Sequence, residues 1–188
     1  MRLRAIGLFF IVSVLLASSL RAQNEPAKES AQVSVCDLVK DPGKYDKQKL
    51  MIQGDIVSEF EDFSIRDKTC SDSDLPGIWL MFGGDVDCPT PSTWDDVNRP
   101  KGKDVEFQGV SYPLLKDRWF KEFYRFVTMR KHQRPVYRAN ATLEGTFFAG
   151  HISTGNDPGK EAPGYGHLGC CRLFIIERVI YAKADRIQ

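Results

Sequence analysis

The stretch Lys49–Phe60 reads "KLMIQGDIVSEF", and this stretch decides the fold. Leu50, Ile52 and Ile56 alternate with polar residues across Gly54. An alternation of apolar and polar residues predicts a half-buried strand. A glycine inside such a strand fits a bulge or a sharp coil, by which a small barrel bends one long strand round a corner. We therefore expect a long, glycine-bent strand in a small β barrel.

Four further segments predict the other strands of this barrel. Each is a short run of apolar or alternating residues bounded by turn-forming residues. The run at 77–82 is nearly continuous in apolar residues, which is typical of a strand buried on both sides. In chain order these segments are "DFSIRD" at 62–67, "GIWLMF" at 77–82, "NATLEGTFFAG" at 140–150 and "CCRLFIIERVIYA" at 170–182.

Two segments change to a helical period. In "DRWFKEFYRFVTMRK" at 117–131 the aromatic residues fall on one face, which predicts a core helix that begins after Asp117 as its N-cap. Near residue 33 a short helix is expected after Ser34 as N-cap, and Pro42-Gly43 stops it. The segment 104–115, "DVEFQGVSYPLL", looks extended, with Pro113 suggesting an edge position.

The order of these elements predicts a mostly β fold. We expect a five-stranded OB-like (oligonucleotide/oligosaccharide-binding) barrel with a short N-terminal helix and one helix between strands 3 and 4. Two segments rich in Gly and Pro, Gly83–Lys103 and His151–Gly169, are predicted to be long surface loops. Loops of this length in a compact domain commonly bind a ligand or move.

The N-terminus has the layout of a secretory signal peptide. Arg2 and Arg4 precede an apolar run from Ala5 to Ala17, which is short for a membrane span. We expect cleavage after Ala22, with cleavage after Ser19 and retention as an anchor as the alternatives. This divides the chain into a signal peptide at 1–22, a disordered leader at 23–32 and a barrel domain at 33–188. The predicted location is exported, either periplasmic or extracellular, with no membrane span after cleavage.

The charge balance bears on the class of partner. The chain has 26 Lys and Arg against 25 Asp and Glu, and residues 1–22 hold Arg2, Arg4 and Arg21 but no acid. Cleavage leaves 23 bases against 25 acids, a net charge of about −2. Nucleic-acid binders commonly show a marked basic excess, so we expect no nucleic-acid partner. The alternative is a local basic face for single strands on the second helix, made of Arg118, Lys121, Arg125 and Lys131.

The chain contains five cysteines, Cys36, Cys70, Cys88, Cys170 and Cys171. In an exported protein cysteines are more often bridges than metal ligands. Adjacent cysteines on a strand point to opposite faces. We expect Cys36 to bridge to Cys170 or Cys171, and the sequence leaves the connectivity open, with Cys70 as a further candidate.

The motifs of several enzyme classes are missing from the sequence. The chain lacks the Gly-x-Ser-x-Gly elbow of serine hydrolases, the phosphate-binding glycine loop and the paired Cys-x-x-Cys spacing of zinc sites. We therefore expect no catalytic residues, no bound metal and no cofactor. The alternative from another class is a metal- or thiol-dependent enzyme that uses His151, His167 and the cysteine pair Cys170-Cys171.

Several of these segments also carry a resemblance. Together, "VCDLVKDPGKYDKQKLMIQGDIV", "EDFSIRD", "GIWLMF", "ATLEGTFFAG" and "GYGHLGCCRLFIIERV" resemble a group of exported bacterial proteins of uncharacterised function with an OB-like core. The resemblance runs from Val33 to about Tyr181 and leaves the loop Gly83–Lys103 poorly matched. It implies the barrel and export, and it implies no catalytic residues.

We expect the protein to act by binding and not as a catalyst. The predicted contact surface is formed by the two long loops, with Trp94, His151, Tyr165 and His167 as candidate ligand-binding residues. Flat amphipathic rings suit a carbohydrate, peptide or protein partner, because they supply contact area at little entropic cost.

Overall fold

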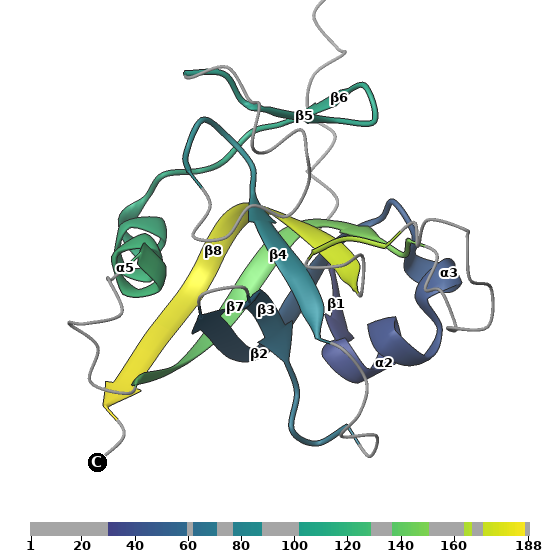
Figure 1. The fold of residues 1–188 in the computed structure, drawn as a ribbon, viewed down its shortest axis with the longest axis horizontal. Coiled ribbons are helices and arrows are strands. Elements are labelled where there is room, and N and C mark those ends of the chain that lie inside the picture. The colour runs from purple at the N-terminus through teal and green to yellow at the C-terminus, as the bar shows by residue number, and fades with distance from the viewer. Residues whose placement is uncertain are drawn as a thin grey trace, which may run out of the picture.

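The computed structural model of the chain describes residues 30–59, 62–70, 77–87, 102–128, 137–150, 164–166 and 171–186. Within these ranges the secondary structure consists mainly of strands with three short helices (Figure 1). The elements, in chain order, are β1 (Ala31–Ser34), α2 (Val35–Lys40), α3 (Pro42–Tyr45), β2 (Lys49–Glu59), β3 (Asp62–Arg66), β4 (Ile78–Phe82), β5 (Val105–Phe107), β6 (Val110–Tyr112), α5 (Arg118–Thr128), β7 (Tyr137–Phe148) and β8 (Arg172–Arg186).

Five of the strands close into a barrel. The sheet runs in the order β1-β2-β3-β4-β8-β7, and an additional pairing between β2 and β7 closes the ring. Strands β4 and β8 are parallel, whereas the other pairs around the ring are antiparallel. With α5 between β4 and β7, this is the five-stranded OB-like barrel that the sequence predicts.

The long strand β2 holds the barrel together. Its first part pairs with β7 on one edge and with the short parallel strand β1 on the other. Its last part, from Asp55, pairs with β3, so β1 and β3 follow one another along the same edge. Gly54 lies at the change from β1 to β3. A Cβ atom at Gly54 would come within 2.6 Å of the carbonyl oxygen of Arg66, which explains why a glycine stands there.

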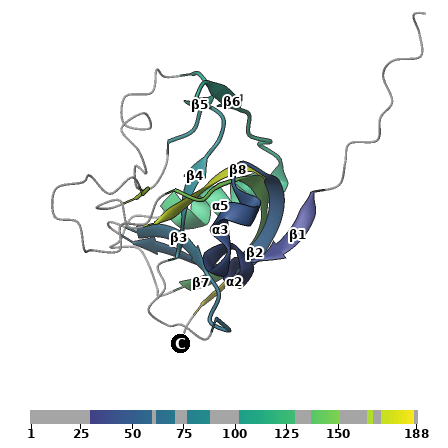
Figure 2. The same ribbon diagram turned by 90° about the vertical axis from the view of Figure 1, so that its right-hand side faces the viewer.

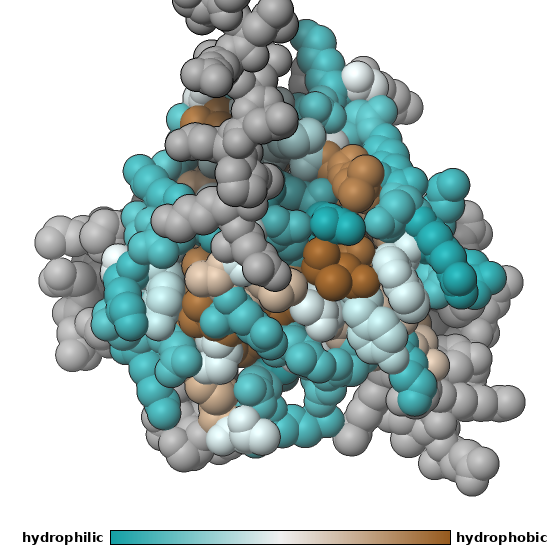
Figure 3. Space-filling model, turned by 180° about the vertical axis from the view of Figure 1, so that it is seen from behind, coloured by the Kyte–Doolittle hydropathy of each residue, from teal (hydrophilic) through white to brown (hydrophobic). Residues whose placement is uncertain are grey.

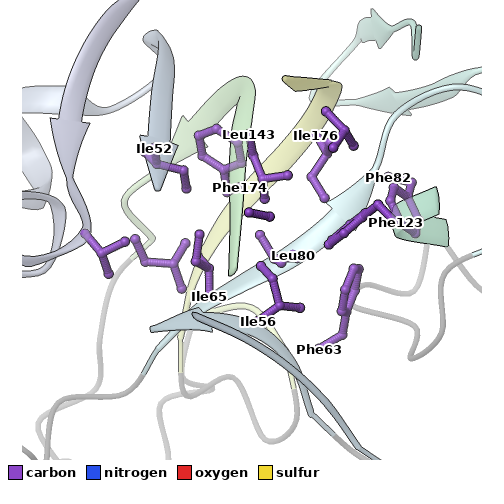
Figure 4. Close-up of a cluster of buried hydrophobic side chains, with 14 of the residues drawn as sticks. Ile52, Ile56, Phe63, Ile65, Leu80, Phe82, Phe123, Leu143, Phe174 and Ile176 are labelled. Atoms are coloured by element: carbon purple, nitrogen blue, oxygen red, sulfur yellow. The ribbon is translucent and has the colours of Figure 1, made fainter. Parts of the chain in front are cut away.

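The barrel interior is apolar. Every second side chain of the barrel strands points inward, and Leu50, Ile52, Phe63 and Phe174 are each at most 1% exposed. Figure 4 shows these inward side chains, drawn from several strands and from α5, meeting in one cluster. A fully buried side chain of this size contributes about 1.5–3 kcal/mol relative to exposure, so this cluster is the main source of stability.

Both predicted N-caps are confirmed. The backbone N–H of Asp37 donates to Ser34 Oγ at 3.0 Å, and the N–H of Phe120 donates to Asp117 Oδ1 at 3.0 Å. On α5 the buried residues are Phe120, Phe123 and Val127, while Trp119 is only partly buried. The buried stripe of α5 therefore consists of Phe120, Phe123 and Val127.

Several elements were not expected. Strand β1 includes Ala31 and Gln32, which were expected to belong to the leader. Pro42-Gly43 ends α2 as predicted, but Pro42 also begins the short helix α3, because proline fits the first turn of a helix. The segment predicted to be extended forms the β5–β6 hairpin, which stands apart from α2 and α3 in both views (Figures 1 and 2).

A second hydrophobic cluster lies outside the barrel ring. Trp79 and Met81, whose side chains point outward from β4, are 3% and 1% exposed. They pack with Val105, Phe107 and Tyr112 of the hairpin and with residues of β7 and β8. OB-like barrels commonly bind their ligands on the outer face of the second and third strands. Here the outward face of β4, the third barrel strand, is buried under the chain's own side chains, and a ligand would have to bind elsewhere.

Candidate functional site

A polar groove of about 470 Å³ opens on the outside of the barrel, next to the gap between β1 and β3. It is lined by segments 32–34, 53–55 and 66–69 and by Asn140 of β7. The outward face of β2 supplies its floor, because Leu50, Ile52 and Gly54 take the inward positions. A groove of this size lies in the range typical of small-ligand sites.

Four polar side chains form a connected chain across this floor. Gln53 Nε2 donates to Asn140 Oδ1 at 3.2 Å, and Asn140 Nδ2 donates to Asp55 Oδ1 at 3.4 Å. Lys68 Nζ lies 2.6 Å from Asp55 Oδ2. Asp55 and Asn140 are direct partners in the antiparallel β2–β7 register, so the sheet itself brings them together. These contacts link the four side chains to one another along the groove.

The wall of the groove is a turn held by its own side chain. Asp67 Oδ1 accepts from the N–H of Thr69 at 2.8 Å and from its hydroxyl at 2.7 Å. An aspartate that bonds the backbone two residues on stabilises a tight turn. This turn places Lys68 over Asp55.

A disulfide joins the two sides of the groove. Cys36, at the start of α2, is bonded to Cys70, with a Cα–Cα distance of 5.4 Å. Ser34 and Thr69, their near neighbours in sequence, both line the groove. The prediction that Cys36 bridges to Cys170 or Cys171 is therefore wrong. Strand β3 and the turn after it place Cys70 beside Cys36 of α2. The bond ties β1 and α2 to the turn after β3.

The same corner contains the one group of metal-ligating side chains found among the described residues. One ligand atom each from Cys36, Asp67 and Cys70 lies within 4.8 Å of the others. A cysteine binds metal as a thiolate, and in this structure both sulfurs are bonded to each other. The corner is thus a disulfide and not a metal centre.

Of the candidate ligand-binding residues, the structure describes Tyr165. Its backbone exchanges two hydrogen bonds with Cys171, and its ring packs edge-on against Phe107 at 5.6 Å between centroids. Burial, followed by the negative charge of Asp46, raises the pKa of the Tyr165 hydroxyl. These contacts give Tyr165 a packing role against the β5–β6 hairpin. Trp94, His151 and His167 lie outside the described residues.

The cysteine pair is described only at Cys171. Cys171 is 5% exposed and disulfide-bonded, and its partner is not among the described cysteines. A bonded sulfur has no thiolate to act as a nucleophile. Cys88 and Cys170 lie outside the described residues.

Arg172, next to Cys171, is buried inside the end of the barrel. It is 5% exposed, and its Nη2 donates to the carbonyl oxygen of Val39 at the end of α2 at 2.8 Å. Among the described residues, nothing accepts a hydrogen bond from its Nε or Nη1. Burial lowers the pKa of the guanidinium. The hydrogen bond to Val39 places the guanidinium at the C-terminal end of α2, where a positive charge is favourable.

The sequence did not single out Gln53, Asp55, Lys68 or Asn140. Each is an ordinary polar residue on a solvent-facing strand or turn, and only the β2–β7 register assembles them. The sequence gives only a weak indication of this groove. Polar Gln53 and Asp55 flank Gly54, the position at which β2 changes its partner from β1 to β3.

The fold and the site together define the class of protein. It is a small OB-like barrel whose third strand, β4, is covered on its outer face by the β5–β6 hairpin, and it has a polar groove beside a disulfide. Comparison of the chain with protein-family models, curated proteins and solved structures found no match. None of the helices in the described ranges is long and apolar enough to cross a membrane.

Proposed function

We propose that this protein is an exported binding protein that carries out no reaction of its own, and that its polar groove binds a short oligosaccharide. The observation that carries the proposal is the connected chain Gln53–Asn140–Asp55–Lys68 on the groove floor. A sugar hydroxyl both donates and accepts hydrogen bonds. Side-chain amides, a carboxylate and an ammonium group offer both kinds of partner in one place.

The rigidity of the groove supports a binding role. Its floor belongs to paired strands, its wall is fixed by the Asp67 turn, and a disulfide ties the two sides. Groups that are already in position lose little entropy when the ligand binds. This arrangement favours affinity for a polar ligand without a closing movement.

Export is part of the proposal. It is supported by the charged and apolar N-terminal segment of the sequence and by the Cys36–Cys70 disulfide, since disulfides persist mainly in oxidising compartments. The resemblance to exported bacterial proteins with an OB-like core agrees with it. The finer location, periplasmic or extracellular, belongs to the same proposal.

The experiment is calorimetric titration of the purified protein with maltotriose, chitotriose and trigalacturonate. We expect at least one of them to bind, and Asn140→Ala to weaken that binding by about tenfold, because two hydrogen bonds of the floor are lost. The matched control is Thr142→Ala, an outward position on the same strand that does not line the groove. Equal weakening by both variants, or no binding of any sugar, would contradict the proposal.

The competing hypothesis of a metal- or thiol-dependent enzyme makes a different prediction. It requires a metal ion that leaves on denaturation and is lost in His167→Ala, which native mass spectrometry measures. The disulfide at Cys171 weakens the thiol form of this hypothesis, because it removes the nucleophile.

A further inference from the structure

A partly exposed strip of apolar and aromatic side chains follows the line between α5 and β8. Leu115 is 50% exposed and Tyr181 is 39% exposed. The Tyr181 ring packs on Trp119 of α5, with 5.2 Å between the ring centroids. Leu115, just before α5, forms a backbone bridge with Arg178 of β8. On the face of the molecule that Figure 3 shows, hydrophobic side chains form separate patches among mostly hydrophilic ones.

Beyond Trp119 on the same side of α5, Glu122 and Phe126 line a groove of about 290 Å³ between the second half of α5 and the end of β8. Phe126 and three alanines, Ala139, Ala182 and Ala184, supply much of its lining. Alanines leave space beside a helix that larger side chains would fill. The strip and the groove together are called the α5–β8 strip below.

Cations border the α5–β8 strip on both sides. Arg118 and Arg125 are exposed on α5, and Arg178 and Lys183 are exposed on β8. Arg125 and Lys183 line the groove itself. Glu122, which also lines the groove, is engaged by Arg118, whose Nε lies 3.0 Å from Glu122 Oε1. The chain as a whole is nearly neutral, with a formal net charge of +1. In the groove lining, Arg125 and Lys183 outnumber the acidic Glu122, so the groove has a local excess of positive charge.

We propose that the α5–β8 strip docks an acidic polypeptide segment that also carries apolar side chains. The apolar side chains would fill the alanine-lined groove and cover Leu115, as in recognition of an amphipathic segment by a groove. The carboxylates would meet the bordering cations, which speed association and fix the register.

The geometry of the rings favours a polypeptide over a nucleic acid. Single-strand binders present ring faces on which successive bases stack. Here the Trp119 and Tyr181 rings pack on each other at 57°, and Arg118 lies over the Trp119 ring at 5.5 Å. These contacts leave no pair of parallel ring faces for stacked bases, whereas they suit the packing of aliphatic side chains.

The test is fluorescence anisotropy with the full protein and a labelled helical peptide that places Leu on one face and Glu on the other. Comparison probes are a scrambled peptide of the same composition and a thymidine oligonucleotide. We expect the amphipathic peptide to bind at least tenfold more tightly than either. Equal binding of the scrambled peptide, tighter binding of the oligonucleotide, or no binding of the amphipathic peptide would overturn the proposal.

Charge reversal locates the surface. Arg125→Glu with Arg178→Glu should weaken peptide binding by about tenfold, whereas Lys103→Glu, an exposed lysine before the hairpin, should change it less than twofold. If the double variant loses its thermal transition, Tyr181→Ala takes its place. An equal effect of the double variant and the control would overturn the assignment. Lys68→Ala should leave peptide binding unchanged, because Lys68 lines the polar groove and not the α5–β8 groove, which separates this result from oligosaccharide binding.

Discussion

Gly145 is the residue whose lack of a side chain is most strictly required. It lies at an irregularity in the β7–β8 register, and a Cβ atom built there would overlap the carbonyl oxygen of Ile175. Because the clash is with backbone, no side chain can move away to relieve it. We expect Gly145→Ala to lower the free energy of unfolding by about 2 kcal/mol or more in urea denaturation.

The control for Gly145 is Gly43→Ala in α3. Nothing lies within 4 Å of a Cβ atom at Gly43, and its φ is not positive. Alanine there should change the free energy of unfolding by less than about 1 kcal/mol, and a small gain is consistent with a stiffer unfolded chain. If both variants lose the same stability, the close approach at Gly145 is not the cause.

Arg172 is a buried cation with a single hydrogen bond among the described residues. A buried charge that lacks full compensation costs stability, and an apolar residue of similar volume is often neutral or stabilising in its place. We expect Arg172→Met to leave the free energy of unfolding unchanged or to raise it by up to about 2 kcal/mol. A loss of more than about 2 kcal/mol would show that the guanidinium is compensated by more than the bond to Val39.

At the scale of elements, the disulfide links α2 to the turn after β3. Its cysteines are 34 residues apart in sequence, and a loop of that length restricts the unfolded chain by about 4 kcal/mol in the chain-entropy treatment. Cys36→Ser with Cys70→Ser should lose about 2–4 kcal/mol in guanidinium denaturation. A loss under about 1 kcal/mol would mean that these elements stay in place without the bond.

The hairpin and the segment at 164–166 attach to the barrel through aromatic packing that also makes stability depend on pH. Burial raises the pKa of Tyr112 and, together with Asp46, that of Tyr165. The unfolded chain would lose these protons first, near pH 10. The folded form then holds more protons than the unfolded form, so stability falls as the pH rises above 10.

Alkaline denaturation measures this dependence. Tyr165→Phe should lose less stability between neutral pH and pH values above 10 than the parent protein does, because phenylalanine does not ionise. Tyr181→Phe is the control, since Tyr181 lies on the exposed strip. If Tyr165→Phe and Tyr181→Phe lose the same stability above pH 10, this would argue against the burial of the Tyr165 hydroxyl.

The elements differ in how well the sequence predicts them. The barrel strands and α5 were recognised because their hydrophobic period is clear over enough residues. The β5–β6 hairpin was not recognised from the sequence. Its turn uses Gln108 at φ 51° and Gly109 at φ 76°, and Gln-Gly lacks the Asn-Gly or Asp-Gly signature of such turns. The first two residues of β1, Ala31 and Gln32, were assigned to the polar leader, since this strand is held by pairing with β2 and by little burial of its own.

At the scale of the whole molecule, the candidate site was the hardest feature to predict. The expected contact surface consisted of loops with aromatic residues and histidines, which are visible one at a time in the sequence. The groove depends on two strands far apart in the chain, which bring Asn140 beside Asp55, and on a disulfide whose connectivity the sequence left open. Long-range pairing, and not residue type, creates this site.

Above all, we propose that the groove beside β1 and β3 binds a short oligosaccharide. The most direct test is an NMR titration of the isotope-labelled protein with maltotriose, chitotriose and trigalacturonate, which follows every backbone amide at once. We expect saturable shifts for at least one sugar, centred on Gln53, Asp55, Thr69 and Asn140. Shifts centred on other residues, or no saturable shift with any of the three sugars, would contradict it.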